Sequence, residues 1–454
     1  MIAEMGAVTR LWAQLRVGDR ARYLERASQG VVDEFDDCCA AVAGEARRPP
    51  VEVAALEVLP AVDALRWLGD NAKRLLGAHR FALPRALHPL TRASAGHAPV
   101  GVVGVRGATG APFGLPLCAI GAALLGGNGV VFAPTAQASV GAERILRVLG
   151  RAGLPEGLVA LGDPALEGCD AVLELGGGPR GGDAMIVLAD ARLDRAVEGA
   201  LWAACAGAGE LAGSLKRVYV ERDVFDDFVT ALVEAASALQ PGRGELGEMS
   251  GEESSAALAA AVAEAVAEGA FVRCGARAAS GAVGFSPLVL TGVPASARLL
   301  RERVGGPVLC VAAVADPVEA AALANSPQRC LGASIWSVDR RHAVRIAREL
   351  EARVVWGNDH FPALPLRQAA ADALEDCGRA QLITWEPSSG RPPWRYPYDD
   401  AASVAARTVA ALYSRRDGER EQAVRDGGRA VVRVLGRSVW RPQTDGRRGQ
   451  DAQS

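Results

Sequence analysis

The sequence predicts an α/β protein in which helices cover parallel β-sheets. Short apolar strands alternate with helical patterns through residues 99–177 and again through 178–360. This alternation is typical of parallel sheets with helical crossovers. Half of the 454 residues are hydrophobic and the mean hydropathy is +0.11. The chain therefore has enough apolar material for more than one large core.

The first 80 residues are predicted to be mainly helical. Leu11, Leu15 and Leu24 recur at roughly helical spacing, and apolar residues between 53 and 76 do the same. The stretch FALPRALHPLTRASAGHAPV that follows suits two strands joined by a loop.

Residues 99–177 are predicted to form the first parallel sheet. The β-branched run GVVGV, bounded by glycine, indicates a buried strand. The elements expected in this part are, in order, strand 101–105, helix 115–127, strand 129–134, helix 138–153 and strand 157–161.

Residues 178–360 are predicted to form the second sheet and its helices. The expected strands are 185–190, 217–220, 308–314, 332–338 and 352–358, and the expected helices are 193–209, 224–239, 256–270, 318–325 and 342–350. The tail from Pro387 is predicted to hold one amphipathic helix near 400–415 and to end in about a dozen disordered residues.

Composition excludes several classes of function. A net charge of −3 gives no electrostatic footprint for nucleic acid. No run of 18 apolar residues indicates a membrane span, and the N-terminus lacks the pattern of a signal peptide. Nine scattered cysteines without a C-x-x-C pair fit a reducing cytoplasm, and five histidines without ligand spacing indicate no metal site. The arginine-, alanine- and glycine-rich composition is typical of a GC-rich bacterial genome.

A series of segments in fixed order resembles the NAD(P)-dependent aldehyde dehydrogenase superfamily over residues 10–386. The segments are APVGVVGV, PFGLPLCAIGAALLGGNGVVFAP, AGLPEGLV, ELGGG, DAMIVLADARLDRAVEGAL, KRVYVERDVFDDFV, GGPVLCVAAVADPVEAAALAN, LGASIWSVDRRHAVRIAREL and VVWGNDH. Each segment alone is weak, but eight or more in register are specific.

The resemblance implies the family's domain plan. Residues 1–80 and 99–177 would form a shortened Rossmann-like cofactor domain, and residues 178–360 would form the catalytic-type α/β domain. Residues 81–98 and 380–386 would form a small β oligomerisation element, followed by the tail 387–454. Members are usually dimers or tetramers, and the implied cofactor is NAD or NADP.

The family's reaction uses a cysteine nucleophile, an asparagine and a backbone N–H for the oxyanion, and a glutamate base. Aligned through KRVYV, the nucleophile position falls on Ala212, whose methyl group forms no thioester. The asparagine position falls on Gly110, which has no amide side chain.

The cofactor ligands are also replaced. The family's lysine position falls on Ala133, and its glutamate position falls on Arg303, which cannot accept hydrogen bonds from a ribose. The neighbouring Pro134 and Thr135, together with the later Gly176 and Gly177, remain as vestigial cofactor-binding positions.

Glu174 has two interpretations. The reading ELGG matches the family's glutamate motif and makes Glu174 the general base. Alternatively, CDAVLELGGGPRGG is the strand and glycine turn of the F-T-G-S-x-x-x-G cofactor motif, in which Glu174 replaces an aromatic residue. Under both interpretations, this chain lacks much of the βα unit that binds the cofactor in the family.

Several other side chains have a functional and a structural interpretation. Cys205 lies seven residues before Ala212 and is either a displaced nucleophile or, as we favour, a buried thiol; Cys118 is expected to be core. Ser214 lacks an activating histidine and is interpreted as a loop residue. For Asp359 and His360, an acid–base pair is possible, but a structural role is favoured.

Two segments have alternatives of the same kind. GGGPRGG either binds phosphate or forms a shortened turn, which we favour. RPPWRYPY either binds a partner or packs over a subunit surface.

The sequence thus predicts a pseudoenzyme that serves as an oligomeric scaffold or as the partner of an active paralogue. It would be a homo-oligomer (dimer or tetramer) or a hetero-oligomer with an active paralogue. The loss of the family's cofactor-binding side chains makes binding of NAD or NADP doubtful. No nucleic-acid or membrane partner is expected. The alternatives are an NAD(P)-dependent oxidoreductase with a rearranged site and a small-molecule binding module that uses the vestigial cleft.

Overall fold

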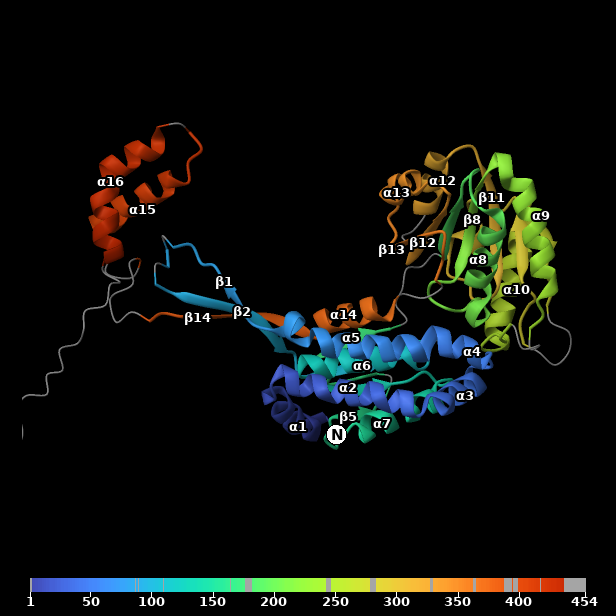
Figure 1. Ribbon diagram of the computed structural model, residues 1–454, viewed down its shortest axis with the longest axis horizontal. Helices are drawn as coiled ribbons and strands as arrows, with labels where there is room; N and C mark the ends of the chain where they lie inside the picture. Colours follow the sequence, from blue (N-terminus) through green and yellow to red (C-terminus); the bar gives the residue numbers. More distant parts are fainter. Residues whose placement is uncertain are drawn as a thin grey trace, which may run out of the picture. The chain divides into compact units, whose positions relative to one another are not determined.

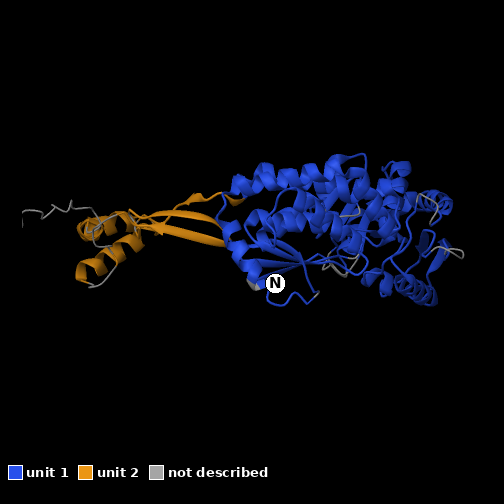
Figure 2. Ribbon diagram, turned by 90° about the horizontal axis from the view of Figure 1, so that it is seen from below, with its two compact units in different colours: residues 1–75, 99–379 blue, residues 76–98, 380–454 orange. Residues whose placement is uncertain are grey.

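The structure is a computed structural model of the chain. It describes residues 2–85, 87–88, 90–108, 110–163, 165–175, 182–241, 246–277, 283–326, 330–361, 365–387, 394, 399–416 and 418–436. The chain divides into two compact units (Figure 2). Unit 1 comprises Met1–Leu75 and Pro99–Arg379, and unit 2 comprises Leu76–Ala98 and Ala380–Ser454.

The N-terminal part of unit 1 is helical and precedes the first sheet. Its helices are α1 (Ile2–Gln14), α2 (Val17–Asp33), α3 (Phe35–Ala46), α4 (Pro50–Val53), the π-helix η1 (Ala54–Val58) and α5 (Leu59–Leu76). The prediction that these residues are mainly helical is confirmed.

The first sheet of unit 1 has four parallel strands in the order β5-β4-β3-β6. The strands are β3 (Val102–Arg106), β4 (Gly129–Ala133), β5 (Val159–Leu161) and β6 (Ala171–Glu174), connected in part by α6 (Gly114–Gly126) and α7 (Ser139–Arg151). Helix α6 is apolar all round and nearly every one of its residues is buried. Such a helix belongs in a core, and Figure 1 shows it enclosed by α2, α5 and α14 (Leu366–Asp376).

The second sheet of unit 1 has seven strands in the order β13-β12-β7-β8-β11-β10-β9, parallel except for the pair β10 and β9. The strands are β7 (Asp183–Val187), β8 (Leu215–Glu221), β9 (Phe271–Cys274), β10 (Leu288–Thr291), β11 (Val308–Val314), β12 (Gly332–Trp336) and β13 (Val354–Gly357). The predicted α/β fold with parallel sheets is therefore confirmed.

Helices cover both faces of this second sheet. The helices are α8 (Leu193–Cys205), the 3-10 turn η2 (Ala206–Gly209), α9 (Arg222–Ala238), α10 (Glu252–Ala267), α11 (Arg298–Arg301), α12 (Pro317–Asn325) and α13 (Arg340–Ala347). One apolar cluster joins α8 and α9 to the sheet, and another joins α12 and α13 to it. Asp316 and Asp339 cap α12 and α13 by accepting backbone N–H bonds.

Unit 2 combines a small sheet with a helical hairpin. Strands β1 (His79–Phe81), β2 (Arg92–Pro99) and β14 (Gly378–Trp385) lie in the order β1-β2-β14. Helices α15 (Asp400–Leu412) and α16 (Glu419–Gly436) pack against each other. The residues predicted to form a β oligomerisation element thus share one sheet, while its role in oligomerisation stays a prediction.

Two predictions of secondary structure were wrong, and one further helix was not predicted. The tail holds two helices, and Gly427 lets α16 approach α15 closely, because a β-carbon there would clash with the Thr408 hydroxyl oxygen. The predicted helix 193–209 ends at Cys205. Residues after Asn358 contain α14, whose alanine- and leucine-rich sequence favours a helix.

Candidate active site and its vestigial cleft

The loop 206–214 carries Ala212, at the predicted nucleophile position. Helix α8 ends before this loop because residues 207–209 have φ values of 61°, 52° and 71°, in the left-handed region. Two of these three residues are glycines, which adopt that conformation without a steric penalty. The bend therefore gives Ala212 a defined backbone position.

The bend is fixed by backbone contacts at Gly209. The N–H of Gly306 donates to the Gly209 carbonyl at 3.0 Å, and the buried ammonium group of Lys216 donates to the same carbonyl at 2.9 Å. Lys216 also donates to the Gly306 carbonyl. Burial lowers the pKa of Lys216 to about 8. The buried side chain of Lys216 thus stabilises the conformation of the loop 206–214.

Ala212 lines a cavity of about 610 Å³, which we call the Ala212 cavity. Leu115 of α6 and Leu366 of α14 contribute apolar walls, and Glu174 lies in the lining as well. The methyl group of Ala212 is not a nucleophile. The cavity therefore has space for a small molecule, but residue 212 supplies no atom that could attack it.

The predicted oxyanion position, Gly110, has a backbone conformation and a close neighbour that both disfavour a side chain. Its φ is +91°, and a β-carbon would lie 3.1 Å from the carbonyl oxygen of Glu210. Its own carbonyl accepts a hydrogen bond from the guanidinium group of Arg48. The backbone of the loop 206–214 therefore lies close to the position that the β-carbon of an asparagine at residue 110 would occupy.

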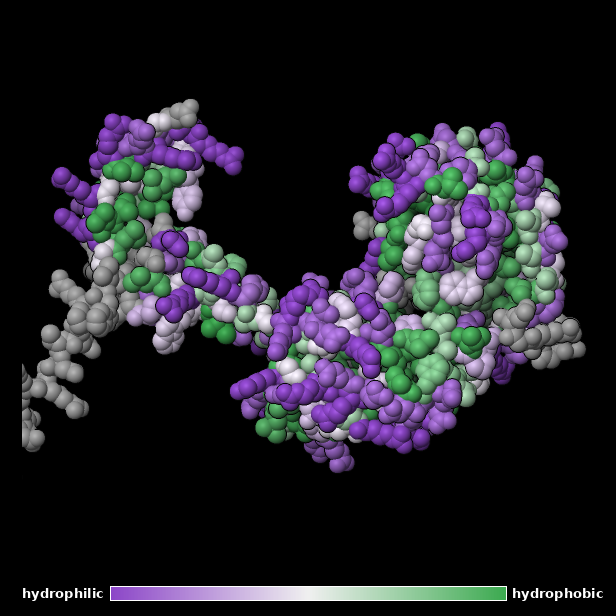
Figure 3. Space-filling view, viewed as in Figure 1, coloured by the Kyte–Doolittle hydropathy of each residue, from purple (hydrophilic) through white to green (hydrophobic). Residues whose placement is uncertain are grey.

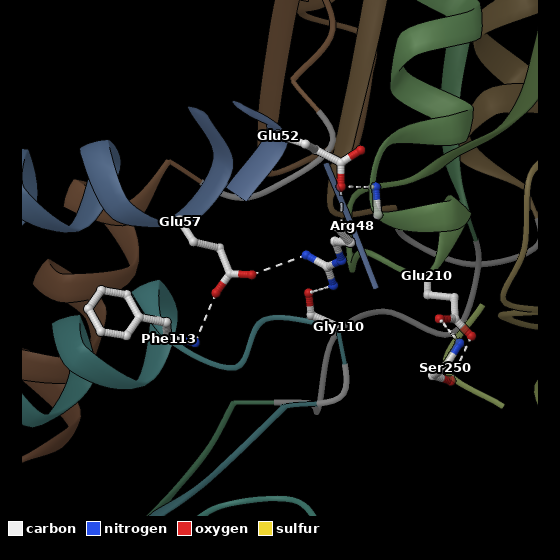
Figure 4. Close-up of polar contacts among 8 residues, drawn as sticks. Arg48, Glu52, Glu57, Gly110, Phe113, Glu210 and Ser250 are labelled. Carbon is white, nitrogen blue, oxygen red and sulfur yellow. Dashed lines mark hydrogen bonds and ion pairs between the residues drawn. The ribbon is translucent and has the colours of Figure 1, made fainter. Parts of the chain in front are cut away.

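A buried ionic cluster stabilises this arrangement (Figure 4). Arg48 lies 3.1 Å from the carboxylate of Glu57, and both side chains are at most 5% exposed. The other oxygen of Glu57 accepts the backbone N–H groups of Phe113, at 2.8 Å, and Gly114, at 3.1 Å. Glu57 thereby satisfies free N–H groups at the start of α6 and fixes the loop before that helix.

Glu52 extends the cluster to the second loop. Its carboxylate oxygen accepts the backbone N–H of Gly207 at 2.9 Å and lies 3.9 Å from Arg48. Burial raises the pKa of both Glu52 and Glu57, while the nearby Arg48 opposes that rise. One arginine and two glutamates thus connect the loops that carry Gly110 and Ala212.

Arg303, at the predicted cofactor-glutamate position, contacts the same bend. Its guanidinium group donates to the carbonyl of Glu210 at 3.3 Å. The carboxylate of Glu210 accepts from the backbone N–H and the hydroxyl group of Ser250, at 2.8 and 2.9 Å. These side chains are therefore used in contacts within the protein.

The predicted cofactor segment after β4 is packed against the loop after β3. Ala133 is buried, and its carbonyl accepts the N–H of Gly107 at 2.8 Å. A β-carbon on Gly107 would lie 3.1 Å from the Thr135 nitrogen and 3.2 Å from the Pro134 α-carbon. The two loops are thus in van der Waals contact at the carboxyl edge of the sheet, where open α/β sheets bind ligands.

Glu174 is the last residue of β6 and pairs with Arg106 at the end of β3, at 2.8 Å. Both side chains are partly exposed. The carboxylate of Glu174 accepts hydrogen bonds from the guanidinium group of Arg106. Gly176 and Gly177, and most of the GGGPRGG segment, lie outside the described residues.

The candidate thiols are buried. Burial raises the pKa of Cys205 to about 12 and also raises the pKa of Cys118. A thiol with a raised pKa carries little thiolate near neutral pH and is a poor nucleophile. The geometry thus supports the interpretation of both as core residues.

Ser214 and His360 are also buried. The Ser214 hydroxyl group has no hydrogen-bond partner among the described residues. The His360 Nδ1 atom lies 2.9 Å from the Ser334 hydroxyl oxygen, and its Nε2 atom lies 3.7 Å from the carboxylate of Asp183. His360 is fully buried, which favours a structural role, while the neighbouring Asp359 is exposed. Most of RPPWRYPY lies outside the described residues.

The described residues include neither a metal-binding cluster nor a membrane-spanning helix. No group of three or more His, Cys, Asp or Glu side chains is placed to hold a metal ion. No described helix is both long enough and apolar enough to span a membrane.

The roles of Arg48, Glu52 and Glu57 were not predicted from the sequence. A signal was available, because two glutamates interrupt the apolar pattern of PPVEVAALEVL directly after an arginine pair. Charged side chains in an otherwise buried helical segment indicate a paired cluster.

Known proteins resemble this chain over most of its length. The model of the aldehyde dehydrogenase family matches residues 1–165 and 165–368. The 4,4'-diapolycopene aldehyde oxidase of Methylomonas sp is 30% identical over 376 residues, covering 75% of this chain and 70% of that protein. The 2-hydroxymuconic semialdehyde dehydrogenase of Pseudomonas putida is 28% identical over 411 residues, covering 77% and 80%. The NAD+ complex of an aldehyde dehydrogenase from Bacillus cereus has a TM-score of 0.75 at 21% identity, covering 82% and 85%.

Proposed function

The chain belongs to the aldehyde dehydrogenase family, and from this premise we propose that it keeps the family scaffold without the family chemistry. It is then a pseudoenzyme that acts as an oligomeric scaffold or as the partner subunit of an active paralogue. The observation that carries the proposal is the pair of loops at Ala212 and Gly110. The first has no nucleophile, and the second has no oxyanion-binding side chain and a positive φ that disfavours one.

The residues present do not fit the family's dinucleotide cofactor. Ala133 offers a buried methyl group in place of an ammonium group, and Arg303 donates to a backbone carbonyl in place of accepting from a ribose. The contact of Gly107 with Pro134 and Thr135 leaves less space for a ligand at the carboxyl edge of the first sheet. We therefore propose that NAD and NADP bind weakly or not at all, and no reaction step is assigned to them.

A role in assembly is supported by the surface of unit 2. Leu382, Ile383 and Trp385 lie on the outer strand β14 and are 48%, 62% and 70% exposed. Apolar side chains are also visible on the helical hairpin of α15 and α16 in Figure 3. Exposed apolar residues on a strand edge favour association with another chain.

The proposal is tested with purified protein, NAD or NADP, and a panel of aldehydes. We expect no increase in NADH or NADPH absorbance and no rise in melting temperature with either cofactor, because a ligand that binds the folded state stabilises it. Cofactor-dependent turnover would refute inactivity. Loss of that turnover in Cys205→Ala would identify a displaced nucleophile and establish the rearranged-site alternative.

The role in assembly is tested separately by light scattering during gel filtration. We expect an oligomer that dissociates when Ile383→Ser and Trp385→Ser are combined. A wild-type chain that stays monomeric and captures no paralogue would refute the scaffold.

A small-molecule binding module is the second candidate, because the Ala212 cavity keeps about 610 Å³ of space. Its volume lies in the range of ligand pockets. Protection of the wild type, but not of Ala212→Trp, by a small apolar ligand in a thermal-shift screen would support this candidate.

A further inference from the structure

A second cavity of about 640 Å³ lies on the other side of the buried cluster, and we call it the Glu52 cavity. Helices α4, η1, α8 and α9 contribute to its wall, which is mainly apolar and includes Leu56, Leu201 and Leu239. Trp202 supplies an aromatic surface that is 40% exposed. Concave, mainly apolar cavities of this size with a few polar groups are typical ligand sites.

The charged groups in the wall of this cavity are all acidic. Glu52, Asp194 and Glu198 are carboxylates in the wall, and no lysine, arginine or histidine lies among the lining residues. Glu198 has a partly compensating partner in Arg195, at 3.6 Å, with both side chains exposed. The cavity therefore favours a positive charge over a negative one.

Glu52 is the carboxylate that is best placed to bind a cation. Its side chain is 11% exposed, and the hydrogen bond from Gly207 and the contact with Arg48 both involve the same oxygen, Oε1. No described residue donates a hydrogen bond to Oε2. Because Arg48 is shared with Glu57, the cluster of one guanidinium and two carboxylates has a formal charge of −1 when both acids are ionised.

We propose that the Glu52 cavity binds a small hydrophobic primary ammonium ion. The ammonium group donates to Oε2 of Glu52, while the apolar body lies against Trp202 and the leucines of the wall. A buried negative cluster gains most from a partner that supplies both charge and N–H donors. The indole ring of Trp202 adds a cation–π surface. This inference does not depend on whether the chain is catalytically active.

The test is calorimetric titration of the full chain with three probes of one shape at pH 7.5 and low salt. The probes are 2-phenylethylamine, the neutral 2-phenylethanol and the anionic 3-phenylpropanoate. We expect the amine to bind at least about tenfold more tightly than the alcohol, because hydrogen bonds to charged groups are the stronger kind. The carboxylate should not bind.

Glu52→Gln removes the charge but keeps an oxygen for the N–H of Gly207. We expect this variant to bind the amine about tenfold or more weakly and the alcohol nearly unchanged. Glu34→Gln is the matched control, because Glu34 is also a buried, ion-paired glutamate but lies outside the cavity. It should leave amine binding unchanged.

Any of three results would overturn the proposal: equal affinity for amine and alcohol, equal loss of affinity in Glu34→Gln, or no binding of the amine. If Glu52→Gln fails to fold by circular dichroism, the double substitution of Asp194→Asn and Glu198→Gln replaces it. These rim carboxylates are not part of the buried cluster. Their removal should weaken amine binding severalfold, and unchanged binding would then count against the site.

Discussion

Substituting Glu57 tests whether the buried cluster holds the loops at Gly110 and Ala212 in place. Glu57→Gln removes the ionic contact with Arg48 at 3.1 Å and leaves one oxygen for the N–H groups of Phe113 and Gly114. Breaking a buried ion pair from one side costs about 3–5 kcal/mol. Arg48 keeps Glu52 as a partner, so we expect the lower end, a loss of about 3 kcal/mol in the free energy of unfolding.

The free energy is measured by urea unfolding, followed by the fluorescence of the eight tryptophans. Hydrogen exchange gives a local readout, since the amides of Phe113 and Gly114 should exchange faster in the variant. Asp63→Asn is the control, because its pair with Arg367 is about half exposed, and exposed ion pairs contribute little to stability. A loss in Glu57→Gln no larger than in Asp63→Asn, or unchanged exchange at Phe113 and Gly114, would refute the reasoning.

Three further predictions concern the loop and its surroundings. Ala212→Cys should create a thiol that reacts with iodoacetamide but gives no aldehyde-dependent NADH, because the oxyanion side chain is still missing; turnover above wild type would contradict this. Lys216→Met should abolish a pH-dependent gain in stability. The lowered pKa of Lys216 means that the unfolded chain binds more protons, so wild-type stability rises between pH 8 and 10.5, by about 3 kcal/mol in total, and urea unfolding at several pH values measures it. Gly209→Ala should destabilise by about 3 kcal/mol, because φ is +71° and the new β-carbon would clash with the Gly306 carbonyl oxygen. Gly150→Ala, where a β-carbon meets nothing within 4 Å, should be neutral or stabilising, and equal urea midpoints for the two alanine variants would disprove the strain.

Local patterns were sufficient to predict the parallel sheets and most of their helices. Runs such as GVVGV and VLCVAAV are buried strands in the structure, because β-branched residues between helices suit a sheet covered on both faces. Elements were missed where the local signal was ambiguous. Helix α16 contains Gly427 and Gly428, which disfavour an isolated helix, and only the close contact with Thr408 explains the first of them.

By itself, the sequence determined the family. Alignment through KRVYV predicts an alanine at the nucleophile position, and such a replacement is visible without coordinates. Only the tertiary structure decided what surrounds those positions. Arg48, Glu52 and Glu57 meet loops that lie about 50 to 160 residues away in the chain, and contacts at such separations leave no periodic pattern in a sequence. The closure around Gly110, the burial of Cys205 and the acidic wall of the Glu52 cavity therefore depend on how the helices and loops of unit 1 pack together.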